Sequence, residues 1–569
     1  MTSLDDDRGL PENEMEINMT QLHRLALTVA VFGAFIAGSV QAAPDDMACM
    51  ACHSSISKAH SGAVHKDIGC VSCHTGSKEH LTDPKKHPSS PFDPKACGAC
   101  HQEQYKSAFT MSDKPIRKSK KASDGPAPDP FFDRALGAHG FTKEHDIPRG
   151  HGMMAIDQFI VDRAFGGRFE PKDGWLYSTL PDGKSYKVWD VLKDNHPETN
   201  EQKVFEPGTA KAANAVCWTC KTTDPMLGWA YLGDDVKGAT FNRASNPVEL
   251  VRTVNHGFNC NLCHDPHTGK ERIVRDALID AMTRPGDWNV YNKFAKNPTK
   301  LDVEDVNTRG FTRKVAYPEK KDSRLLCAQC HVEYICNSGI DSRTGKPIGF
   351  DSHLTNHFPW VNADQIEAYY DEIGFRDFKH NRTGALLVKM QHPDSETFFG
   401  STHDKAGATC QTCHMPKVTD EKGKTYTLHW ATSPKEYVKE TCLSCHKDKT
   451  EKQMVTAIDT MKNHFDGKVR EAEARMNDMF NAFDQAQAVG VDESVLEQAR
   501  KLHATAHINW EYWTAVNGAY FHNHEMAMRS LAKSVKASTE AANLLRKAAA
   551  EKVKANEEAA KQAPAASAK

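Results

Sequence analysis

The sequence predicts a mainly α-helical chain with little β-structure, and three observations carry this prediction. A pentapeptide that begins Cys-x-x-Cys recurs eight times along the 569 residues. The first three copies are separated only by short polar loops that contain Gly, Pro and Lys. After the last copy, apolar residues recur at helical spacing over three stretches. We therefore expect short motif-bearing segments, followed by long helices.

The N-terminus has the pattern of an export signal. Residues 25–37, LALTVAVFGAFIA, form an apolar core too short to span a bilayer, and a small-residue cleavage sequence, VQA, follows. The residues upstream of Met19 are acidic, which is wrong for a signal peptide, so we expect translation to start at Met19 and the mature protein to begin near Ala43. No other stretch is long and apolar enough for a transmembrane helix. We predict an exported, periplasmic protein without stable membrane insertion.

The repeated pentapeptide indicates covalent haem. Seven copies read Cys-x-x-Cys-His, the attachment signature of a c-type haem, in which both thiols bond to the porphyrin and the histidine binds the iron. The eight cysteine pairs use 16 of the 17 cysteines. The copies with histidine are Cys49/Cys52/His53, Cys70/Cys73/His74, Cys97/Cys100/His101, Cys260/Cys263/His264, Cys327/Cys330/His331, Cys410/Cys413/His414 and Cys442/Cys445/His446.

Other uses of cysteine explain the pattern less well. A disulfide framework suits a secreted protein, but it does not require this spacing. Zinc ribbons pair Cys-x-x-Cys units, yet they have no need for histidine after the second cysteine. Electron-transfer haems also need a second axial ligand each, and 22 of the 29 histidines remain outside the motifs. A net charge of −3 gives no indication of nucleic-acid binding.

The C-terminal stretches predict three amphipathic helices. Such stripes are far more often core or subunit contacts than chemistry. Gly490 should end the first helix, and after about residue 549 large apolar residues nearly vanish. The stripes are Val469, Ala472, Met476, Met479 and Phe483; Val495, Ala499, Leu502, Ala506, Trp513 and Val516; and Met528, Leu531, Val535, Ala542 and Leu545.

One copy of the pentapeptide differs from the others. CWTCK, with Cys217 and Cys220, keeps both cysteines and replaces the histidine by Lys221. A degraded motif would lose its cysteines as readily, so the covalent anchor survives and only the axial ligand changes. A lysine amine must lose its proton to bind metal, and it has no second ring nitrogen for outer-shell tuning. One haem unlike seven similar ones is the natural candidate for a substrate site.

CWTCK, followed by CAQCHVEY and later by KMQHP, resembles the cytochrome c nitrite reductases, the ammonia-forming multihaem enzymes. Their pentahaem core would cover about residues 131–530, and the three additional N-terminal motifs make the chain most similar to the octahaem nitrite reductases. The resemblance implies eight covalent haems, Lys221 as the proximal ligand of the catalytic haem, and six-electron reduction of nitrite to ammonia. Hydroxylamine and sulfite are expected as further substrates.

The spacing of the motifs and the composition of the chain predict the domain organisation. We predict a leader (1–42), an N-terminal trihaem domain with the linker 114–130 (43–130), a catalytic pentahaem domain (131–460), long helices that complete this domain and make oligomer contacts (461–548), and a solvated or disordered tail (549–569).

The family's distal pocket maps by resemblance to Arg163, Tyr334 and His392. Arginine offers a permanent positive fork to the oxygens of nitrite, and histidine and tyrosine can supply protons. Each residue also has a plainer interpretation. Arg163 or the nearby Arg168 could pair with a haem propionate, Tyr334 could pack against a porphyrin edge, and His392 could be an axial ligand of another haem.

The same resemblance implies a calcium ion and several distal haem ligands. Calcium would be held by Glu333, Gln391 and the backbone carbonyls of Tyr334 and Lys389, which are hard oxygen ligands. The implied distal ligands are His151, His403, His429 and His522. For the N-terminal haems, His60, His65, His80, His139 and His145 are candidates.

Cys336 is the cysteine left over from the pairs. It lies two residues after Tyr334, and octahaem nitrite reductases carry a tyrosine–cysteine cross-link at this spacing. The resemblance therefore implies a thioether that fixes the phenol and lowers its pKa. The alternative is a buried free thiol.

Three other functions are weighed against nitrite reduction. A hydroxylamine oxidoreductase is also an octahaem enzyme, but its catalytic haem keeps histidine, which CWTCK lacks. A tetrathionate reductase is the next enzyme alternative. A non-catalytic electron conduit should have eight equivalent motifs, which Lys221 contradicts. For a nitrite reductase we expect an electron-donor protein or quinol-linked cytochrome as partner, and a homo-oligomer formed through the C-terminal helices.

Overall fold

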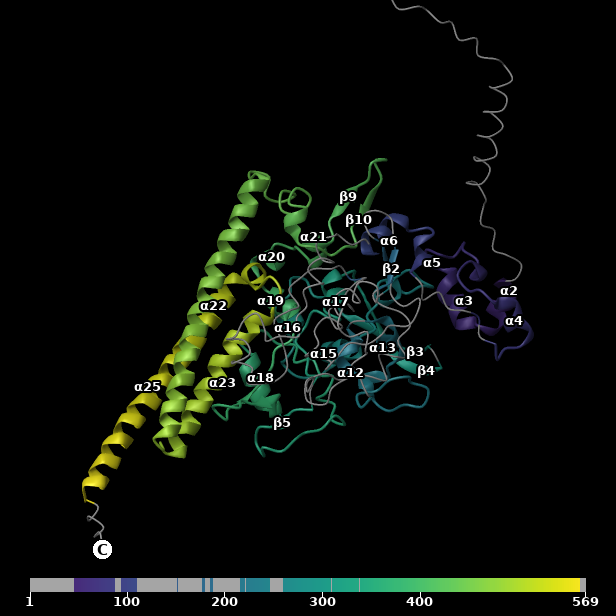
Figure 1. The fold of residues 1–569 in the computed structure, drawn as a ribbon. Helices are drawn as coiled ribbons and strands as arrows, with labels where there is room; N and C mark the ends of the chain where they lie inside the picture. The colour runs from purple at the N-terminus through teal and green to yellow at the C-terminus, as the bar shows by residue number, and fades with distance from the viewer. Residues whose placement is uncertain are drawn as a thin grey trace, which may run out of the picture. The chain divides into compact units, whose positions relative to one another are not determined.

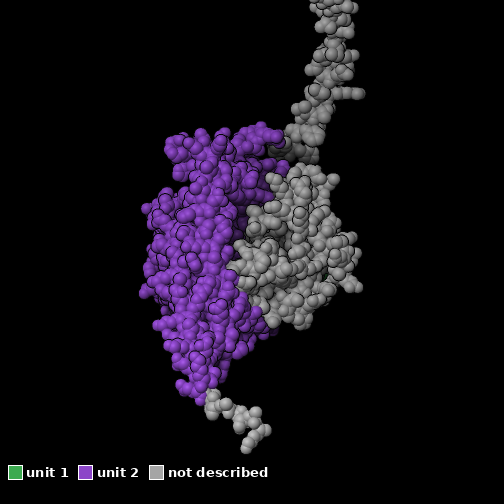
Figure 2. Space-filling view, turned by 60° about the vertical axis from the view of Figure 1, so that its left-hand side comes forward, with its two compact units in different colours: residues 1–91, 267–269 green, residues 92–266, 270–569 purple. Residues whose placement is uncertain are grey.

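The fold is described from a computed structural model. It describes residues 46–86, 88, 94–109, 151, 177–179, 185–187, 215–220, 222–245, 259–308, 310–336 and 338–562. These residues fall into two compact units, and Figure 2 shows unit 2 in purple. Unit 1 draws on residues 1–91 and 267–269, and unit 2 on residues 92–266 and 270–569. The CGACH motif at 97–101 groups with unit 2, whereas the sequence predicts a domain boundary near residue 130.

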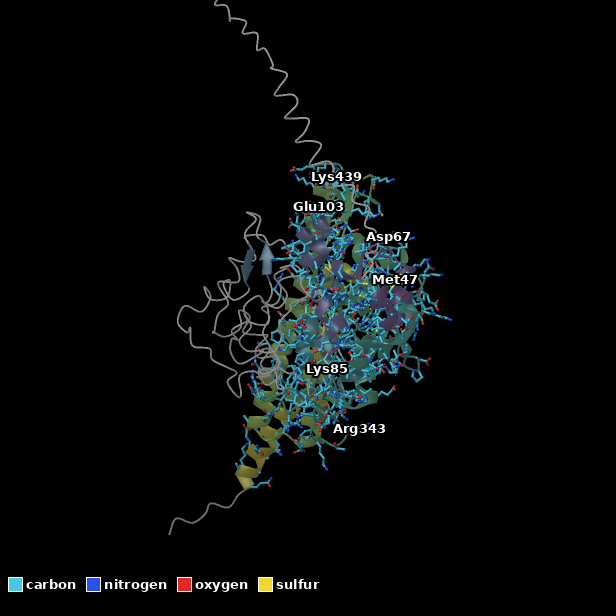
Figure 3. The ribbon with its side chains drawn as sticks, turned by 90° about the vertical axis from the view of Figure 1, so that its right-hand side faces the viewer. Met47, Asp67, Lys85, Glu103, Arg343 and Lys439 are labelled. Carbon is cyan, nitrogen blue, oxygen red and sulfur yellow. The ribbon has the colours of Figure 1, made fainter. Side chains whose placement is uncertain are left out.

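Unit 1 consists of short helices with almost no core of its own. Of its described residues only Asp46 and Gly69 are buried, and Met47 and Val64 are each 78% exposed. Met47, Asp67 and Lys85 lie at its surface in Figure 3. Amino-acid side chains alone therefore do not explain why this unit is compact. Its elements are α2 (Asp46–Cys52), α3 (Ser54–Ser61), η1 (Cys70–Ser72) and α4 (Ser77–Thr82).

Unit 2 begins with short helices (Figure 1), and half of them carry or adjoin a Cys-x-x-Cys motif. They are α5 (Lys95–Gly98), α6 (Gln102–Phe109), α12 (Ala215–Thr219), α13 (Thr223–Gly228), η3 (Tyr231–Gly233), η4 (Cys260–Leu262), α15 (Asp276–Thr283), α16 (Val290–Phe294), α17 (Ser323–Cys327), α18 (Ile366–Ile373), α19 (Asp394–Phe398), α20 (Thr402–Lys405), α21 (Cys410–His414) and η5 (Pro434–Glu436).

The β-sheets in the described part of the chain are all two-stranded and antiparallel, and a few isolated β-bridges occur beside them. The longest pairs β3 with β4, in the register Leu301↔Pro318 to Thr308↔Phe311. The strands are β1 (Tyr177–Thr179) with β2 (Ser185–Lys187), β3 (Leu301–Thr308) with β4 (Phe311–Pro318), β5 (Ile340–Asp341) with β6 (Phe375–Arg376), β7 (Phe378–Lys379) with β8 (Leu386–Leu387), and β9 (Lys417–Thr419) with β10 (Thr425–Thr427).

The C-terminal region forms long packed helices, as the sequence predicts. They are α22 (Glu451–Ala488), α23 (Glu493–Ala515), the short α24 (Ala519–His522) and α25 (His524–Gln562). A capping box at Thr450 and Gln453 starts α22, and Gly490, with φ of +76°, follows its end. The first predicted stripe is wholly buried, and the other two are buried or pack against the same core. α25 continues as an exposed helix through residues 549–562, a segment of good helix formers.

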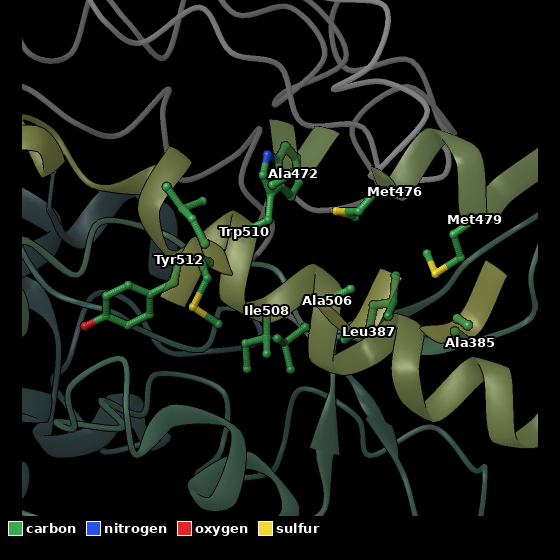
Figure 4. Packing of buried hydrophobic residues seen from close by; sticks show 14 of the residues in the cluster. Ala385, Leu387, Ala472, Met476, Met479, Ala506, Ile508, Trp510 and Tyr512 are labelled. Atoms are coloured by element: carbon green, nitrogen blue, oxygen red, sulfur yellow. The ribbon is translucent and has the colours of Figure 1, made fainter. Parts of the chain in front are cut away.

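These helices bury their apolar faces mainly against one another, and α23 also packs against strand β8. Figure 4 shows Met476 and Met479 of α22, Ala506, Ile508 and Trp510 of α23, and Leu387 of β8 in one cluster. The mainly α prediction is therefore confirmed, and α23 lies against the chain that leads into KMQHP. Within the described residues, no helix combines the length and apolarity that crossing a bilayer requires.

Candidate haem and active site

Each histidine-bearing motif forms one helical turn. In six of them the backbone N–H of the histidine donates to the carbonyl of the first cysteine, at 2.9–3.0 Å, and the seventh lies in α21. Residues three and four apart lie on the same face of such a turn. Both thiols and the imidazole of a motif therefore point to one side, as a covalently attached haem requires.

The protein does not cover all of these attachment residues. A side chain bonded to a haem inside a packed core is expected to be buried, and Cys220 of CWTCK is buried, at 4% exposed. In four of the other motifs the second cysteine is exposed, and in three of these the histidine is exposed too. The exposed residues are Cys52 and His53, Cys73, Cys100 and His101, and Cys445 and His446.

The local sequence explains this exposure. Three of the four motifs stand in the N-terminal part, before residue 110, where short polar loops separate them and few apolar side chains are available to pack over a turn. CLSCH is followed by HKDKTEK, which is equally polar and exposed. Amino-acid side chains alone therefore do not cover Cys73, Cys100, His101 or Cys445.

Five motif histidines lie opposite a second histidine. The pairs, with the distance between ring centroids, are His53–His80 (6.0 Å), His74–His267 (6.2 Å), His151–His331 (6.4 Å), His403–His446 (6.5 Å) and His414–His522 (6.2 Å).

This separation fits an iron between two imidazoles. An imidazole nitrogen binds a transition metal at about 2.0–2.1 Å and the ring centre lies about 1 Å further out, so two axial imidazoles have centroids roughly 6 Å apart. His464 and His524 show the contrast, because their nitrogens touch at 3.2 Å and their centroids are 5.3 Å apart. The distance is informative only beside a Cys-x-x-Cys motif. His503 and His507 are also 6.0 Å apart, but they share one helix and have no such motif next to them.

The pairs include one residue that the sequence reasoning missed. His267, the partner of His74, lies three residues after the motif histidine His264, and a surplus histidine so close to a motif was the available signal. Of the N-terminal candidates, His80 lies opposite His53. His60 and His65 stay candidates, and His139 and His145 lie outside the described residues.

His429 lies near two motif histidines, His264 and His101. Burial lowers the pKa of the His264 imidazole, and the nearby His429 lowers it further. Burial also lowers the pKa of His429, and the charge of His101 acts in the same direction. The His429 N–H donates to Ser107 Oγ at 3.0 Å, in the helix α6 that follows His101. The predicted distal ligand His429 is thus within reach of either motif.

Burial favours neutral imidazoles at other predicted ligands too. It lowers the pKa of His151 and of His522 to about 4, and neighbouring imidazoles act in the same direction. The neutral imidazole is the form that binds a metal. The environments of these histidines are therefore suited to axial ligands.

Several of these imidazoles are held through Nδ1. The partners are Asp394 Oδ2 for His331 (3.0 Å), the Thr432 carbonyl for His414 (2.9 Å), the Thr427 carbonyl for His429 (2.8 Å) and the Lys86 carbonyl for His80 (3.0 Å). A hydrogen bond from Nδ1 fixes the tautomer in which Nε2 is the metal-binding nitrogen. The orientation that an axial ligand needs is thus built into the fold.

Cysteines of different motifs lie beside one another. A hydrogen bond with Cys220 and burial raise the pKa of the Cys330 thiol, and Cys410 and burial do the same for Cys327. Cys97 and burial likewise raise the pKa of Cys260. In unit 1, burial and the carboxylate of Asp46 raise the pKa of Cys70 to about 11. Thiols this close would bring the attached groups within short reach of each other, which is what stepwise electron transfer needs.

Two predicted site segments, far apart in sequence, are joined by hydrogen bonds. Segment 331–336 contains HVEYIC and segment 389–396 contains KMQHPDSE. The contacts are Gln391 N to Glu333 Oε2 (2.6 Å), Glu333 N to Glu396 Oε1 (2.9 Å), Ser395 N to the His331 carbonyl (3.0 Å), and Gln391 Nε2 to Cys336 Sγ (3.3 Å), together with the His331–Asp394 pair.

Two of the predicted catalytic side chains in these segments are buried, and the third, His392, is partly buried. Tyr334 is 5% exposed and Cys336 is 1% exposed, and both belong to the same hydrophobic cluster as Trp218 of the CWTCK helix, α12. Ile335 between them forms a β-bridge with His357, so the chain is extended here. The structure therefore brings HVEYIC, KMQHP and the first part of CWTCK together. Arg163 and Lys221 lie outside the described residues.

The predicted calcium ligands also meet in this place. The Glu333 carboxylate is wholly buried and accepts hydrogen bonds from Gln391 N and, at 2.9 Å, from Tyr370 Oη. Burial raises its pKa well above the usual value, while Gln391 and the Lys389 charge act in the opposite direction. A hard cation would stabilise the charged form of such a carboxylate, so the donor set fits calcium. No group of three or more His, Cys, Asp or Glu side chains within the described ranges could hold a metal ion, so such a site would depend on carbonyl and amide oxygens.

Comparison with known proteins identifies the family. The family model described as cytochrome c552 matches residues 173–569. The chain belongs to the cytochrome c552 family. Covalent haem c follows from this membership, and the predicted resemblance to the cytochrome c nitrite reductases is confirmed at the level of the family. The motifs between residues 49 and 101 lie before the matched range, so the count of eight haems stays a prediction.

Two curated relatives illustrate the similarity. The cytochrome c nitrite reductase subunit NrfA of Nitratidesulfovibrio vulgaris is 29% identical over 383 residues, which is 64% of this chain and 64% of the relative. Cytochrome c-552 of Haemophilus influenzae is 30% identical over 416 residues, covering 70% of this chain and 64% of the relative. The chain thus spans 64% of the length of each of these two proteins.

A solved structure shows the same fold. The catalytic subunit NrfA of the cytochrome c nitrite reductase from Desulfovibrio desulfuricans ATCC 27774, which has two calcium sites, superposes with a TM-score of 0.53. The alignment covers 81% of this chain and 87% of that subunit at 24% sequence identity. At this identity the likeness establishes the fold of this cytochrome c552 family member, and its chemistry must be argued from the residues.

Proposed function

We propose that this cytochrome c552 family member is a periplasmic nitrite reductase that forms ammonia: NO2⁻ + 6 e⁻ + 8 H⁺ → NH4⁺ + 2 H2O. The observation that carries the proposal is the buried cluster in which HVEYIC and KMQHP are joined by hydrogen bonds, in the same core as the CWTCK helix. These are the three segments on which the resemblance to nitrite reductases rests. Family membership supports the same conclusion.

The chain offers a place for eight covalent haems. Seven would be attached at the Cys-x-x-Cys-His motifs, with His80, His267, His151, His429, His522 and His403 as second ligands for six of them, and one would be attached at CWTCK with Lys221 as its ligand. When bound, these groups supply electrons one at a time and an iron that can coordinate nitrite. Lys221 would hold the group at CWTCK, and because no distal histidine is predicted for it, its iron would be open to the substrate.

The surrounding residues bind the anion and supply protons. Arg163 would stabilise the negative charge of nitrite, which is held in a site shielded from water. His392 and the Tyr334 hydroxyl would donate protons to the oxygens as water leaves. Burial of Tyr334 among Trp218, Phe358 and their neighbours excludes bulk solvent, so the donors act in a medium where electrostatic interactions are strong.

We also propose a calcium site, an electron donor and an oligomer interface for this enzyme. Calcium held by Glu333, Gln391 and the carbonyls of Tyr334 and Lys389 would fix HVEYIC against KMQHP and add positive charge near the substrate. Electrons would come from a donor protein or quinol-linked cytochrome, and the long helices α22 and α25 would form homo-oligomer contacts. Hydroxylamine and sulfite are proposed as additional substrates.

The deciding experiment measures ammonia formed from nitrite by the purified holoenzyme with a reduced viologen as electron donor. We expect His392→Asn and Arg163→Ala each to lower the turnover of nitrite by about 100-fold, because proton supply or anion stabilisation is lost. His464→Asn and Arg343→Ala, at an exposed histidine and an exposed arginine, are the matched controls. Production of no ammonia by fully haem-loaded wild-type protein would refute the proposed function. If Arg163 instead holds a propionate, its variant will lose stability or shift a reduction potential while the affinity for nitrite stays nearly the same.

A further inference from the structure

Helix α23 carries a column of buried polar residues that the haem sites do not use. His503, His507 and Glu511 follow one another at four-residue intervals, and each is at most 1% exposed. Residues four apart lie on the same face of a helix, so these three side chains form one line through the interior. The sequence stripe of α23 predicts apolar core residues only, and this second buried line was not foreseen.

The column lies along the chain segment that leads into KMQHP. His503 Nδ1 is 3.0 Å from Thr383 Oγ1, His507 Nε2 is 3.2 Å from the Val388 carbonyl, and Asn517 N donates to Asp394 Oδ1 at 2.7 Å. From residue 383 to residue 394 the two segments therefore run in the same direction. Glu511 lies one helical turn beyond His507, which is about 5.4 Å further along the helix axis. Because an extended residue spans about 3.3 Å, Glu511 lies level with residues just beyond Val388.

The outer end of the column reaches the molecular surface. Thr383 also contacts His380 Nδ1 at 3.2 Å, and its neighbours Asn381 and Arg382 are exposed and partly exposed. The Arg500 guanidinium, which is partly exposed, donates to the Thr383 carbonyl at 2.7 Å. A proton from water therefore has to pass only the turn 380–384 to reach His503.

Each of the three side chains has one buried polar atom without a hydrogen-bond partner among the described residues. His507 Nε2 and Glu511 Oε2 are 2.7 Å apart, whereas His503 Nε2, His507 Nδ1 and Glu511 Oε1 have no hydrogen-bond partner among the described residues. Buried polar atoms normally have partners, and a bridging water would supply them across the 6.0 Å between the centroids of the His503 and His507 rings. Apolar residues would pack at these positions without this difficulty.

We propose that His503, His507 and Glu511 form an internal proton path from the surface turn 380–384 toward the segment 389–392 beside the substrate site. The inference rests on the proposed function, which consumes eight protons per nitrite beside the buried Tyr334. A proton that enters one nitrogen of an imidazole leaves from the other, and Glu511 accepts one proton and releases one. Each relay group therefore returns to its starting protonation state after a proton has passed. The protons come from water, and the electrons arrive separately from the reductant.

The test uses the haem-loaded holoenzyme with His507→Gln and Glu511→Gln. Both substitutions keep a hydrogen-bonding side chain of similar shape, but glutamine does not carry protons. We expect nitrite turnover to fall by about 10-fold or more, with an increased solvent deuterium isotope effect, an unchanged KM for nitrite and unchanged haem content. Glu511→Asp should restore most of the rate, and His464→Gln, at an exposed histidine, is the control.

A second measurement does not need nitrite. Mixing holoenzyme with a viologen radical in dilute buffer with a pH indicator follows the proton uptake that accompanies reduction. We expect this uptake to slow by a similar factor in both glutamine variants and to keep its wild-type rate in His464→Gln. Wild-type uptake in Glu511→Gln overturns the path, whether or not the wild-type enzyme forms ammonia. If the wild-type protein forms no ammonia while uptake still slows in the variants, the proposed function fails and the path stands.

Discussion

His331 Nδ1 lies 3.0 Å from Asp394 Oδ2, and Asn517 holds the same carboxylate through its backbone N–H at 2.7 Å and its side-chain amide at 3.2 Å. The motif histidine of CAQCH is thereby tied to a residue two positions after His392 and to the end of α23. A carboxylate on the outer nitrogen makes an axial imidazole more basic and fixes its orientation. We therefore expect Asp394 to set the properties of the haem bound at residues 327–331.

Replacement of Asp394 by alanine tests this relationship. The reduction potential of one haem should rise, because a less basic imidazole stabilises the oxidised iron less, and nitrite turnover should fall by about 10-fold. Redox titration followed by absorbance measures the first effect. Asp305→Ala, on the exposed strand β3, is the control. A set of potentials identical to that of the wild-type protein would show that Asp394 only packs.

His267→Ala tests the residue that sequence reasoning missed. The structure brings His267 to within 6.2 Å of His74 between ring centroids, inside unit 1. Loss of the second imidazole should convert one haem from low spin to high spin, while mass spectrometry still finds every haem attached. Electron paramagnetic resonance of the oxidised protein detects the change. A low-spin spectrum that does not change would mean that another side chain is the second ligand of His74.

Lys221→His tests the unusual motif. Both thioether bonds remain, so the variant should keep eight haems by intact mass, and only the axial ligand changes. We expect slower nitrite reduction, because an imidazole donates electrons to the iron differently from an amine. Undiminished reduction would show that lysine has no special role. A mass with seven haems in the wild-type protein would mean that one of the motifs, with CWTCK the first to examine, is not an attachment site.

The Tyr334–Cys336 thioether remains a prediction. Residues two apart in an extended chain point to the same side, and both side chains are buried at a bridge with His357. Formation of the C–S bond removes one hydrogen from the ring and one from the thiol, so two electrons must pass to an oxidant such as a peroxide, which becomes water. The linked phenol should titrate below the usual value of about 10.

Tryptic mapping of active enzyme decides whether this bond exists. We expect one peptide mass that lacks two hydrogens and a Cys336 that does not react with alkylating reagents. Cys336→Ser should keep all haems and change the pH–rate profile, because the unlinked phenol holds its proton more tightly. A separate Tyr334 signal together with an alkylated Cys336 would exclude the cross-link.

The sequence by itself predicts the haem attachment motifs and the long C-terminal helices. The Cys-x-x-Cys-His copies specify covalent attachment because the thiols and the imidazole act within one helical turn, which five residues encode by themselves. The stripes of α22, α23 and α25 were equally readable, since an amphipathic helix buries a face that its own spacing defines. CWTCK, HVEYIC and KMQHP likewise identified the family before any fold was known.

The second axial ligands and the contacts of the site depended on the tertiary structure. His267 faces His74 across 193 positions of sequence, and no local pattern encodes such a partner. The bonds from Gln391 to Glu333 and Cys336 also join segments that only folding brings together. The sequence does not predict that His503, His507 and Glu511 are buried, because histidine and glutamate at helical spacing are usually solvated. Their burial depends on the packing of α22, α25 and the β7–β8 hairpin around α23. Sequence thus determined which groups are attached and where helices form, whereas packing decided which side chains face one another.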